Sequence, residues 1–335
     1  MGGGQGATMR NIVIVGSIAF FSAVATAQNS WMTYANETDT RLQSDPSVGI
    51  SDDREKDYIV GDLDMDGDDD LICVRKEPFT STGRNANVLF LNEGGVLVDR
   101  TGTYAVQSDV AGDQGFLTPT NDRDVELVDV NGDGWLDIVT APTLTDNDFK
   151  HLSHPRVYMN LGEDEGVWQG FRHEDARIPQ MHATAGPRFC SVASGDIDGD
   201  GDQDLYFGDY DSGGSQIHDY NNRLLINDGN GFFTDESEAR LTAEMRESAF
   251  GAASEIADMN GDGALDIVKQ TSLNAPQHIA VTWNSPTHEG IYVGYQIIDQ
   301  LAPYHVSVGD LNGDGMLDMI TSDDGVDNYY LNQGN

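Results

Sequence analysis

Short apolar runs and acidic segments alternate along most of this chain. Five acidic segments are each followed by a run of β-branched or other apolar residues: DLICV, DIVTA, DLYFG, DIVKQ and DMITS. Similar runs, YIVGD, VELVD and VSVGD, precede three of these segments. Runs of this length bounded by turn residues are typical of β-strands. We therefore predict that each acidic segment is a turn inside a β-hairpin.

A second strand pair is predicted after each hairpin. The stretches VLFLNEGG, VYMNLGE, LLINDGNG, VTWNS and YYLNQGN each carry an apolar run that ends at an Asn. Strand, Asn-x-Gly turn and strand is the natural interpretation of three copies, with VLVDRT or FFTDES as the next strand. These Asn residues are Asn92, Asn160, Asn227, Asn284 and Asn332. Four antiparallel strands in each of five repeated units, roughly 50 to 67 residues apart, predict the blades of a β-propeller.

The acidic turns share the pattern D-x-[DN]-x-D-G-x-x-D, which begins at residues 62, 129, 196, 258 and 310. Oxygen side chains at positions 1, 3 and 5 of such a turn can point at one centre. A main-chain carbonyl at position 7 and a carboxylate at position 9 can complete an oxygen cage. This is the first part of the calcium loop of EF-hands, although the usual Glu at position 12 is missing. Hard oxygen ligands without His or Cys favour Ca²⁺ over zinc or copper.

We therefore expect about five Ca²⁺ ions, one in each turn. A surface turn that binds no metal is a poor alternative, because four carboxylates held this close repel one another. The predicted ligands, at positions 1, 3, 5, 7 and 9, are Asp62, Asp64, Asp66, Asp68 and Asp70; Asp129, Asn131, Asp133, Trp135 and Asp137; Asp196, Asp198, Asp200, Asp202 and Asp204; Asp258, Asn260, Asp262, Ala264 and Asp266; and Asp310, Asn312, Asp314, Met316 and Asp318.

The acidic turn together with the Asn-x-Gly turn resembles the FG-GAP and VCBS repeats, best known from the calcium-binding propeller of integrin α subunits. The resemblance covers nearly the whole chain after its N-terminal segment. Phe250-Gly251 is the only partial FG-GAP text, which makes the match closer to the bacterial VCBS branch. The resemblance implies an all-β propeller and does not carry over the partner recognition of integrins.

The five units predict a propeller of five blades. The segment SWMTYANETDTRL near the N-terminus looks like GFFTDESEARL, the outer strand and exit of the third unit. We therefore expect residues 31–35 to pair with the strand around residues 329–332 and close the last blade, which removes an open edge. The alternative is a truncated seven-bladed propeller, since the family that the repeats resemble is often seven-bladed.

The N-terminus is predicted to be a signal peptide. Arg10 precedes the apolar run 12–25, and Ala25-Thr26-Ala27 fits a small-residue cleavage site. The run is too short for a membrane span, and the mature chain has no second one. We expect residues 1–27 to be removed and residues 28–335 to form a secreted propeller, either extracellular or periplasmic.

The net charge argues against one class of partner, and the cysteine content argues against a disulfide bond. Acidic residues outnumber basic ones 57 to 18, and the formal net charge is −39. A field of this sign repels phosphate backbones, which argues against nucleic acid as a partner. Cys73 and Cys190 lie in apolar strand-like runs of different units, and we expect both to be buried and not to form a disulfide bond.

The long connections between strands are the expected recognition elements, and they lie on the face opposite the acidic turns. Their candidate contact residues are the aromatic side chains of Phe116, Phe149, Tyr210 and Tyr220. We expect a binding or adhesion module, with glycans or cell-surface proteins as the candidate partners. The alternative is a carbohydrate-active enzyme, a polysaccharide lyase or glycosidase, on the same scaffold. A base or zinc site could then come from His151, His154, His173 and His182, although the chain has no common catalytic motif.

Overall fold

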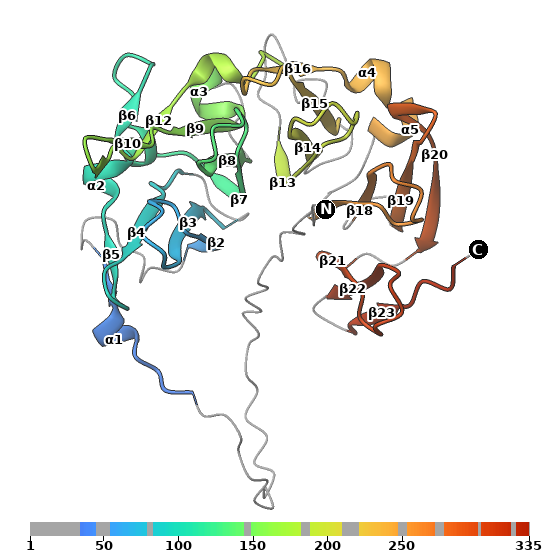
Figure 1. Cartoon of the computed structure of the whole chain (residues 1–335), viewed down its shortest axis with the longest axis horizontal. Coiled ribbons are helices and arrows are strands. Elements are labelled where there is room, and N and C mark those ends of the chain that lie inside the picture. The colour runs from blue at the N-terminus through green and yellow to red at the C-terminus, as the bar shows by residue number, and fades with distance from the viewer. Residues whose placement is uncertain are drawn as a thin grey trace, which may run out of the picture.

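The structure is a computed structural model, which describes residues 34–44, 54–78, 83–143, 149–181, 188–209, 221–246, 253–271, 278–300, 303–322 and 326–334. Its strands form five small, mainly antiparallel sheets that are arranged as the blades of a five-bladed β-propeller (Figure 1). The predicted fold class and the predicted number of blades are therefore confirmed.

Each blade is built from one repeat. Blade one contains β1 (Leu42–Gln43), β2 (Glu55–Gly61), β3 (Asp70–Lys76), β4 (Val88–Asn92) and β5 (Leu97–Asp99). Blade two contains β6 (Gln107–Ser108), β7 (Asp122–Val128), β8 (Asp137–Pro142), β9 (Arg156–Asn160) and β12 (Phe171–His173), with β10 (Glu163–Asp164) and β11 (Val167–Trp168) as a separate small hairpin.

The other three blades have simpler sheets. Blade three contains β13 (Phe189–Gly195), β14 (Asp204–Asp209), β15 (Arg223–Asn227) and β16 (Phe233–Asp235). Blade four contains β17 (Ser254–Ala257), β18 (Asp266–Thr271), β19 (His278–Ser285) and β20 (His288–Asp299). Blade five contains β21 (His305–Gly309), β22 (Asp318–Ser322) and β23 (Asn328–Tyr330), and is three-stranded within the described residues.

The hydrophobic core lies between neighbouring blades. The innermost strands β2, β7, β13, β17 and β21 contact one another in this order. Successive residues of a strand point to opposite faces of its sheet, so each blade can pack against both of its neighbours. One cluster, which includes Ile72 and Tyr158, joins blades one and two, and another, which includes Met159 and Phe207, joins blades two and three. Two further clusters join blade three to blade four and blade four to blade five.

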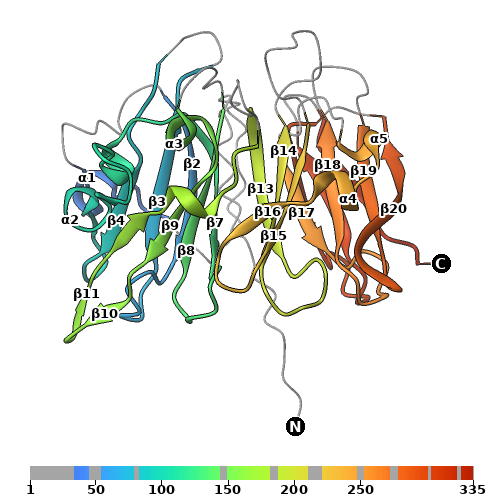
Figure 2. The same ribbon diagram turned by 90° about the horizontal axis from the view of Figure 1, so that it is seen from above.

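The acidic turns and the long connections lie at opposite ends of the strands. Each acidic turn joins the first and second strands of its blade, and each Asn-x-Gly turn follows the third strand. Figure 2 shows α3 (Lys150–Ser153) at one end of blade two and the β10–β11 hairpin at the other. The 3₁₀ helix η1 (Gly115–Leu117) belongs to the connection that leads into blade two.

Short helical turns follow the outer strands and lead to the next blade. They are α2 (Thr101–Tyr104), the 3₁₀ helix η2 (Asp175–Arg177), α4 (Ser237–Arg240) and α5 (Ala243–Arg246). After α2 the chain forms β6, which pairs in parallel with β12 of blade two. The N-terminal helix α1 (Thr38–Arg41) is also followed by a short strand, β1, which pairs in parallel with β5 of blade one. The α1–β1 segment therefore enters blade one as α2–β6 enters blade two.

The predicted closing strand is not where we expected it. Residues 31–33 lie outside the described residues, while Tyr34 and Ala35 are described and form no strand. The ring of Tyr34 is 90% exposed, and the segment leads directly to α1 beside blade one (Figure 1). The placement of Tyr34 and Ala35 against the last blade is therefore corrected: parallel pairing of β1 with β5 holds this segment at blade one.

Both cysteines behave as predicted. Cys73 and Cys190 are buried and free, and burial raises the pKa of each thiol to about 12. The predicted signal peptide, residues 1–27, lies outside the described residues. Among the helices of the described ranges, none has the length and apolar character needed to cross a membrane.

Candidate metal centres

The five acidic loops, residues 62–70, 129–137, 196–204, 258–266 and 310–318, are numbered one to five here. In every loop the carboxylate at position 1 accepts a hydrogen bond from the amide of the Gly at position 6, over 2.8 to 3.2 Å. The carboxylate at position 5 accepts one from the amide of position 7, over 2.9 to 3.1 Å. The backbone amides therefore fold each loop around its own carboxylates.

Loops one and three bring three carboxylates together. Their oxygen atoms lie within 4.8 Å of one another in two sets: Asp62, Asp64 and Asp70, and Asp196, Asp198 and Asp204. Four buried oxygens in these loops have no hydrogen-bond partner: Oδ1 of Asp62, Asp68, Asp196 and Asp198. Buried anionic oxygens are costly without a partner. Three convergent carboxylates with unused oxygens therefore fit a hard divalent cation such as Ca²⁺.

Loops two, four and five carry Asn at position 3, and these side chains accept a hydrogen bond from the amide of position 5. In loops two and five the same Asn also donates to the carboxylate of position 5. The same position-5 amide also donates to the position-1 carboxylate in these loops, so oxygens of positions 1 and 3 lie beside it. Clusters of three carboxylates are found only in loops one and three among the described residues. At position 7, the backbone amides of Trp135, Ala264 and Met316 donate hydrogen bonds to the carboxylate of position 5.

The Asp at position 9 has a second role that the motif did not reveal. Asp137, for example, is fully buried and accepts hydrogen bonds from the amides of Val130 (3.0 Å) and Asn160 (2.7 Å). The same pair of bonds recurs in the other four loops. Each carboxylate therefore joins its loop to the third strand of its blade. Because an ionised oxygen has more than one lone pair, it can also contact a cation.

Burial raises the pKa of these position-9 carboxyls, although the backbone amides partly oppose the effect. The pKa of Asp70 and Asp266 is raised to about 6, and that of Asp137 and Asp204 to about 7. The neighbouring loop carboxylates contribute to the rise through charge repulsion. A bound cation would favour the ionised form, which is the form able to act as a ligand.

In blades two to five, the Asn at the end of the third strand connects two consecutive loops. The side-chain amide of Asn160 donates to the carbonyl of Leu136 in its own loop and to that of Leu63 in the loop of the preceding blade, at 3.2 and 2.9 Å. Asn227, Asn284 and Asn332 make the equivalent pair of bonds. We call these residues the Asn latch. The latch makes the conformation of one acidic loop part of the interface with the next blade.

Loop one differs from the others at position 4. Met65 has a φ of 58°, while loops two to five have Gly at this position, with φ between 70° and 81°. A residue with a Cβ atom pays roughly 1 to 2 kcal/mol in this left-handed conformation. The turn is nevertheless kept in loop one, which indicates that the same loop conformation is required in all five blades.

The candidate histidines at the opposite end pack into the scaffold. His154 is buried and lies 3.0 Å from the hydroxyl of Ser153, and His173 is buried and lies 3.1 Å from that of Ser108. His151 is partly buried against Phe149, with stacked rings 5.9 Å apart. Burial lowers the pKa of His151 and His173. The fourth histidine, His182, lies outside the described residues.

Of the four candidate aromatic residues, one is buried in the core, one is exposed, and two lie outside the described residues. Phe116 is fully buried and packs edge-on against Tyr158, so it belongs to the core. Phe149 is 76% exposed and remains available to a ligand. Tyr210 and Tyr220 lie outside the described residues.

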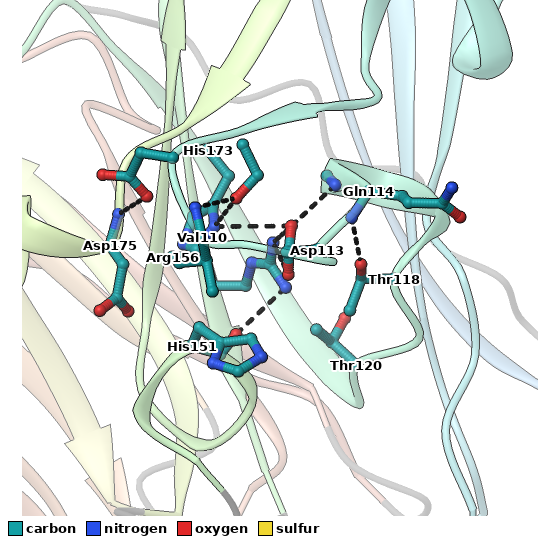
Figure 3. Close-up of polar contacts among 12 residues, drawn as sticks. Val110, Asp113, Gln114, Thr118, Thr120, His151, Arg156, His173 and Asp175 are labelled. Atoms are coloured by element: carbon teal, nitrogen blue, oxygen red, sulfur yellow. Dashed lines mark hydrogen bonds and ion pairs between the residues drawn. The ribbon is translucent and has the colours of Figure 1, made fainter.

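A buried ion pair anchors the connection into blade two. Both oxygens of Asp113 accept hydrogen bonds from Arg156, at 2.8 and 3.0 Å, and both side chains are fully buried. Figure 3 shows Asp113 between Arg156 and His173, whose Nδ1 is 3.7 Å away. Burial alone would raise the pKa of Asp113, but the contacts with His173 and Arg156 outweigh burial and hold it well below its usual range. This group is structural.

Replacing Asp113 by Asn should therefore destabilise the fold by about 3 to 5 kcal/mol, because it leaves the buried Arg156 charge uncompensated. Because the folded-state pKa of Asp113 is depressed, its stabilisation is fully present above the unfolded pKa near 4 and is lost gradually as the pH falls from there through the lower folded-state pKa. Urea unfolding of both proteins at pH 7 and pH 3 measures this. If Asp113→Asn lowers the free energy of unfolding at pH 7 by less than about 1 kcal/mol, the pair is not a stabilising buried ion pair.

Comparisons with known proteins agree with this repeat. The model of the FG-GAP-like repeat matches residues 62–140, 129–207 and 196–268. Each match begins at the first Asp of loop one, two or three and extends into the second strand of the next blade. The matched unit therefore contains two consecutive acidic loops and, between them in sequence, the third strand with its Asn. The expected placement in the VCBS branch is not supported, since the matching family is FG-GAP-like.

One similar solved structure is the crystal structure of the V. cholerae biofilm matrix protein Bap1, with 16% sequence identity and a TM-score of 0.37. The match covers 79% of this chain and 34% of that one, so this chain spans about a third of that protein. No curated protein sequence matches the chain. The three family matches together span residues 62–268, more than half of the 335 residues. The chain therefore belongs to the FG-GAP-like repeat family.

Proposed function

We propose that this protein is a secreted binding or adhesion module whose propeller is stabilised by calcium in its five acidic loops. The observation that carries the calcium part is the convergence of three carboxylates in loops one and three, with buried oxygens that have no hydrogen-bond partner. The residues at positions 1, 3, 5 and 9 of each loop, with the carbonyl of position 7, would hold the ion. Calcium would supply positive charge that offsets repulsion among these carboxylates.

The long-connection end is the proposed recognition surface. It carries Phe149, whose ring is exposed and rests on the imidazole of His151. Lys150 beside it bonds the carbonyl of Asp175. An exposed aromatic face held on a rigid scaffold is suited to stacking against a sugar ring or an apolar side chain. Glycans are therefore the first ligand class to test. The buried, hydrogen-bonded His154 and His173 give no specific support to an enzyme.

A glycan array probed with calcium-loaded protein tests this function. We expect binding to a subset of glycans and a loss of about 5- to 150-fold in affinity for the variant Phe149→Ala, since stacking on an aromatic ring contributes about 1 to 3 kcal/mol. The matched control is Phe232→Ala. Phe232 is also exposed, at 44%, but lies in the turn after Asn227 at the opposite end of the strands.

Two results would count against the proposed recognition surface. One is the absence of binding to any glycan or cell-surface extract, and the other is equal loss of binding in the Phe149 and Phe232 variants. Turnover of a polysaccharide with release of unsaturated or reducing ends would instead favour the enzyme alternative.

A further inference from the structure

Blade five and the N-terminal segment beside blade one each carry hydrogen-bonding groups that have no partner within the described residues. The two sets of groups are complementary. Blades one to four each have a fourth strand beside the third, whereas β23 of blade five pairs only with β22 in the described residues. The side chains of Ile320, Tyr329 and Leu331 are 37%, 53% and 42% exposed there. An unpaired strand edge with exposed apolar side chains is a template for strand addition.

The other blades show which strand and turn normally pair with the edge of a third strand. In blade one, Asp99 ends the fourth strand, and its carboxylate accepts hydrogen bonds from the amide and hydroxyl of Thr101. The hydroxyl of Thr101 in turn accepts a hydrogen bond from the amide of Leu89 in the third strand, at 2.9 Å. Blade three repeats these contacts with Asp235, Ser237 and Leu224. Thr101 and Ser237 are only 1% and 2% exposed.

The N-terminal segment contains the same turn without its strand. The side chain of Asn36 accepts hydrogen bonds from the amide and hydroxyl of Thr38, at 3.1 and 2.8 Å. Thr38 is nevertheless exposed, and its described hydrogen bonds are to Asn36 and, through its carbonyl, to Leu42. Arg41, the last residue of α1, donates a hydrogen bond to the carbonyl of Gly95 in blade one. The equivalent contact elsewhere joins Arg177 to Asn230, between blades two and three. The α1 segment therefore resembles an exit element, and no strand precedes it in the described residues.

The hydrogen bonds of the Asn latch are also incomplete at blades one and five. Leu63, Val130, Ile197 and Met259, at position 2 of loops one to four, are between 0% and 5% exposed, and their carbonyls each accept from the Asn of the next blade. Leu311 at position 2 of loop five is 42% exposed. Among the contacts described, the side-chain amide of Asn92 in blade one donates only to the carbonyl of Asp69 in its own loop. Asn92 and Leu311 therefore lack the partners that the repeat provides elsewhere.

We propose that blade five of one molecule receives the Tyr34–Arg41 segment of a second copy of this chain. The occupant is a second copy because α1 is fixed to blade one by Arg41 and by the β1–β5 pairing, whereas no hydrophobic cluster of the described residues joins blade one to blade five (Figure 1). The interface joins two different surfaces, so it is heterologous and leads to head-to-tail assembly. The proposal does not depend on which ligand the propeller binds.

The repeat also gives the register of the added strand. In blades one and three, the residue before the Asn that ends the third strand pairs with the residue before the Asp of the following turn: Leu91 with Val98, and Ile226 with Thr234. The corresponding pair in the interface is Leu331 with Ala35. Tyr330 then faces Asn36, and Thr38 accepts a hydrogen bond from the amide of Tyr329.

Cysteine cross-linking tests this register. Opposite residues of antiparallel strands are close enough for a disulfide, and the native Cys73 and Cys190 are buried. The variants Ala35→Cys and Leu331→Cys are mixed in calcium and oxidised, and we expect a disulfide-linked heterodimer. The matched control replaces Leu331→Cys by Val326→Cys, which is 75% exposed on the same blade but out of register. Cross-linking no greater than in this control would overturn the proposal.

The double variant Ala35→Cys/Leu331→Cys distinguishes the two possible partners. Linked dimers and longer chains are expected, whereas a monomer with an internal disulfide would show closure within one chain and overturn the proposal. In light scattering, the mass of the unmodified protein should rise with concentration, and Thr38→Val should weaken association roughly fivefold by removing one hydrogen-bond acceptor. Thr101→Val is the control, which should lower stability and leave association unchanged. A monomer at all concentrations would also overturn the proposal.

Discussion

Removal of calcium should lower the unfolding temperature of this protein by roughly 25 to 30 °C. Each of five sites at a calcium concentration of about 100 Kd contributes about 2.7 kcal/mol. For a chain of this size, 1 kcal/mol corresponds to roughly 2 °C. The physical cause is repulsion among the loop carboxylates, which the ion offsets. Differential scanning calorimetry in calcium and in excess chelator measures the difference.

Magnesium provides the control for this experiment. Mg²⁺ prefers to keep several waters and a strict octahedral geometry, so it should restore much less than half of the lost stability at equal concentration. A general effect of ionic screening would instead be reproduced by magnesium or by sodium chloride. Full recovery in either salt would count against specific calcium sites.

Replacing Asp204 by Ala should destabilise the protein by about 3 kcal/mol even in chelator, because each buried donor left unsatisfied costs about 1 to 3 kcal/mol. The donors are the amides of Ile197 and Asn227, which both bond the fully buried Asp204 carboxylate. Calcium should increase the difference from the unmodified protein, since a ligand is also lost. Chemical denaturation with and without calcium gives both values.

Asp200 of the same loop is the matched comparison. It lies at position 5, and its carboxylate accepts from the amide of Asp202 near the protein surface. In calcium, Asp200→Ala should also be destabilising. In chelator it should be neutral or stabilising, because it removes one of several repelling charges. Equal effects of the two substitutions in chelator would show that position 9 has no separate structural role.

Much of the fold could be predicted because the signals are local and repeated. The apolar run DIVTA after loop two indicates a strand without any knowledge of its neighbours, and β8 forms there. The acidic pattern specifies its own turn, since Asp129 and Gly134 bond within the loop. Five copies of such a unit define the blades. The burial of Cys73 and Cys190 followed from the same apolar runs.

The contacts between blades could not be predicted, because they join residues far apart in sequence. The Asn-x-Gly pattern located Asn160, yet nothing in the sequence shows that its amide reaches the carbonyl of Leu63 in another blade. His173 was visible as a titratable residue, but its burial beside Asp113 and Arg156 depends on how the connection into blade two folds. The placement of Tyr34 and Ala35 failed for the same reason. The resemblance to an outer strand was local, whereas the choice of blade depends on β1.

The most direct measurement of the central claim is the number of calcium ions bound to the folded protein. Native mass spectrometry of calcium-loaded protein, with equilibrium dialysis as a second method, gives this number. The account predicts five ions per chain, and four for a variant in which Asp129 and Asp133 of loop two are replaced by Ala. A protein that binds no calcium, or whose calcium content is unchanged in that variant, would contradict it.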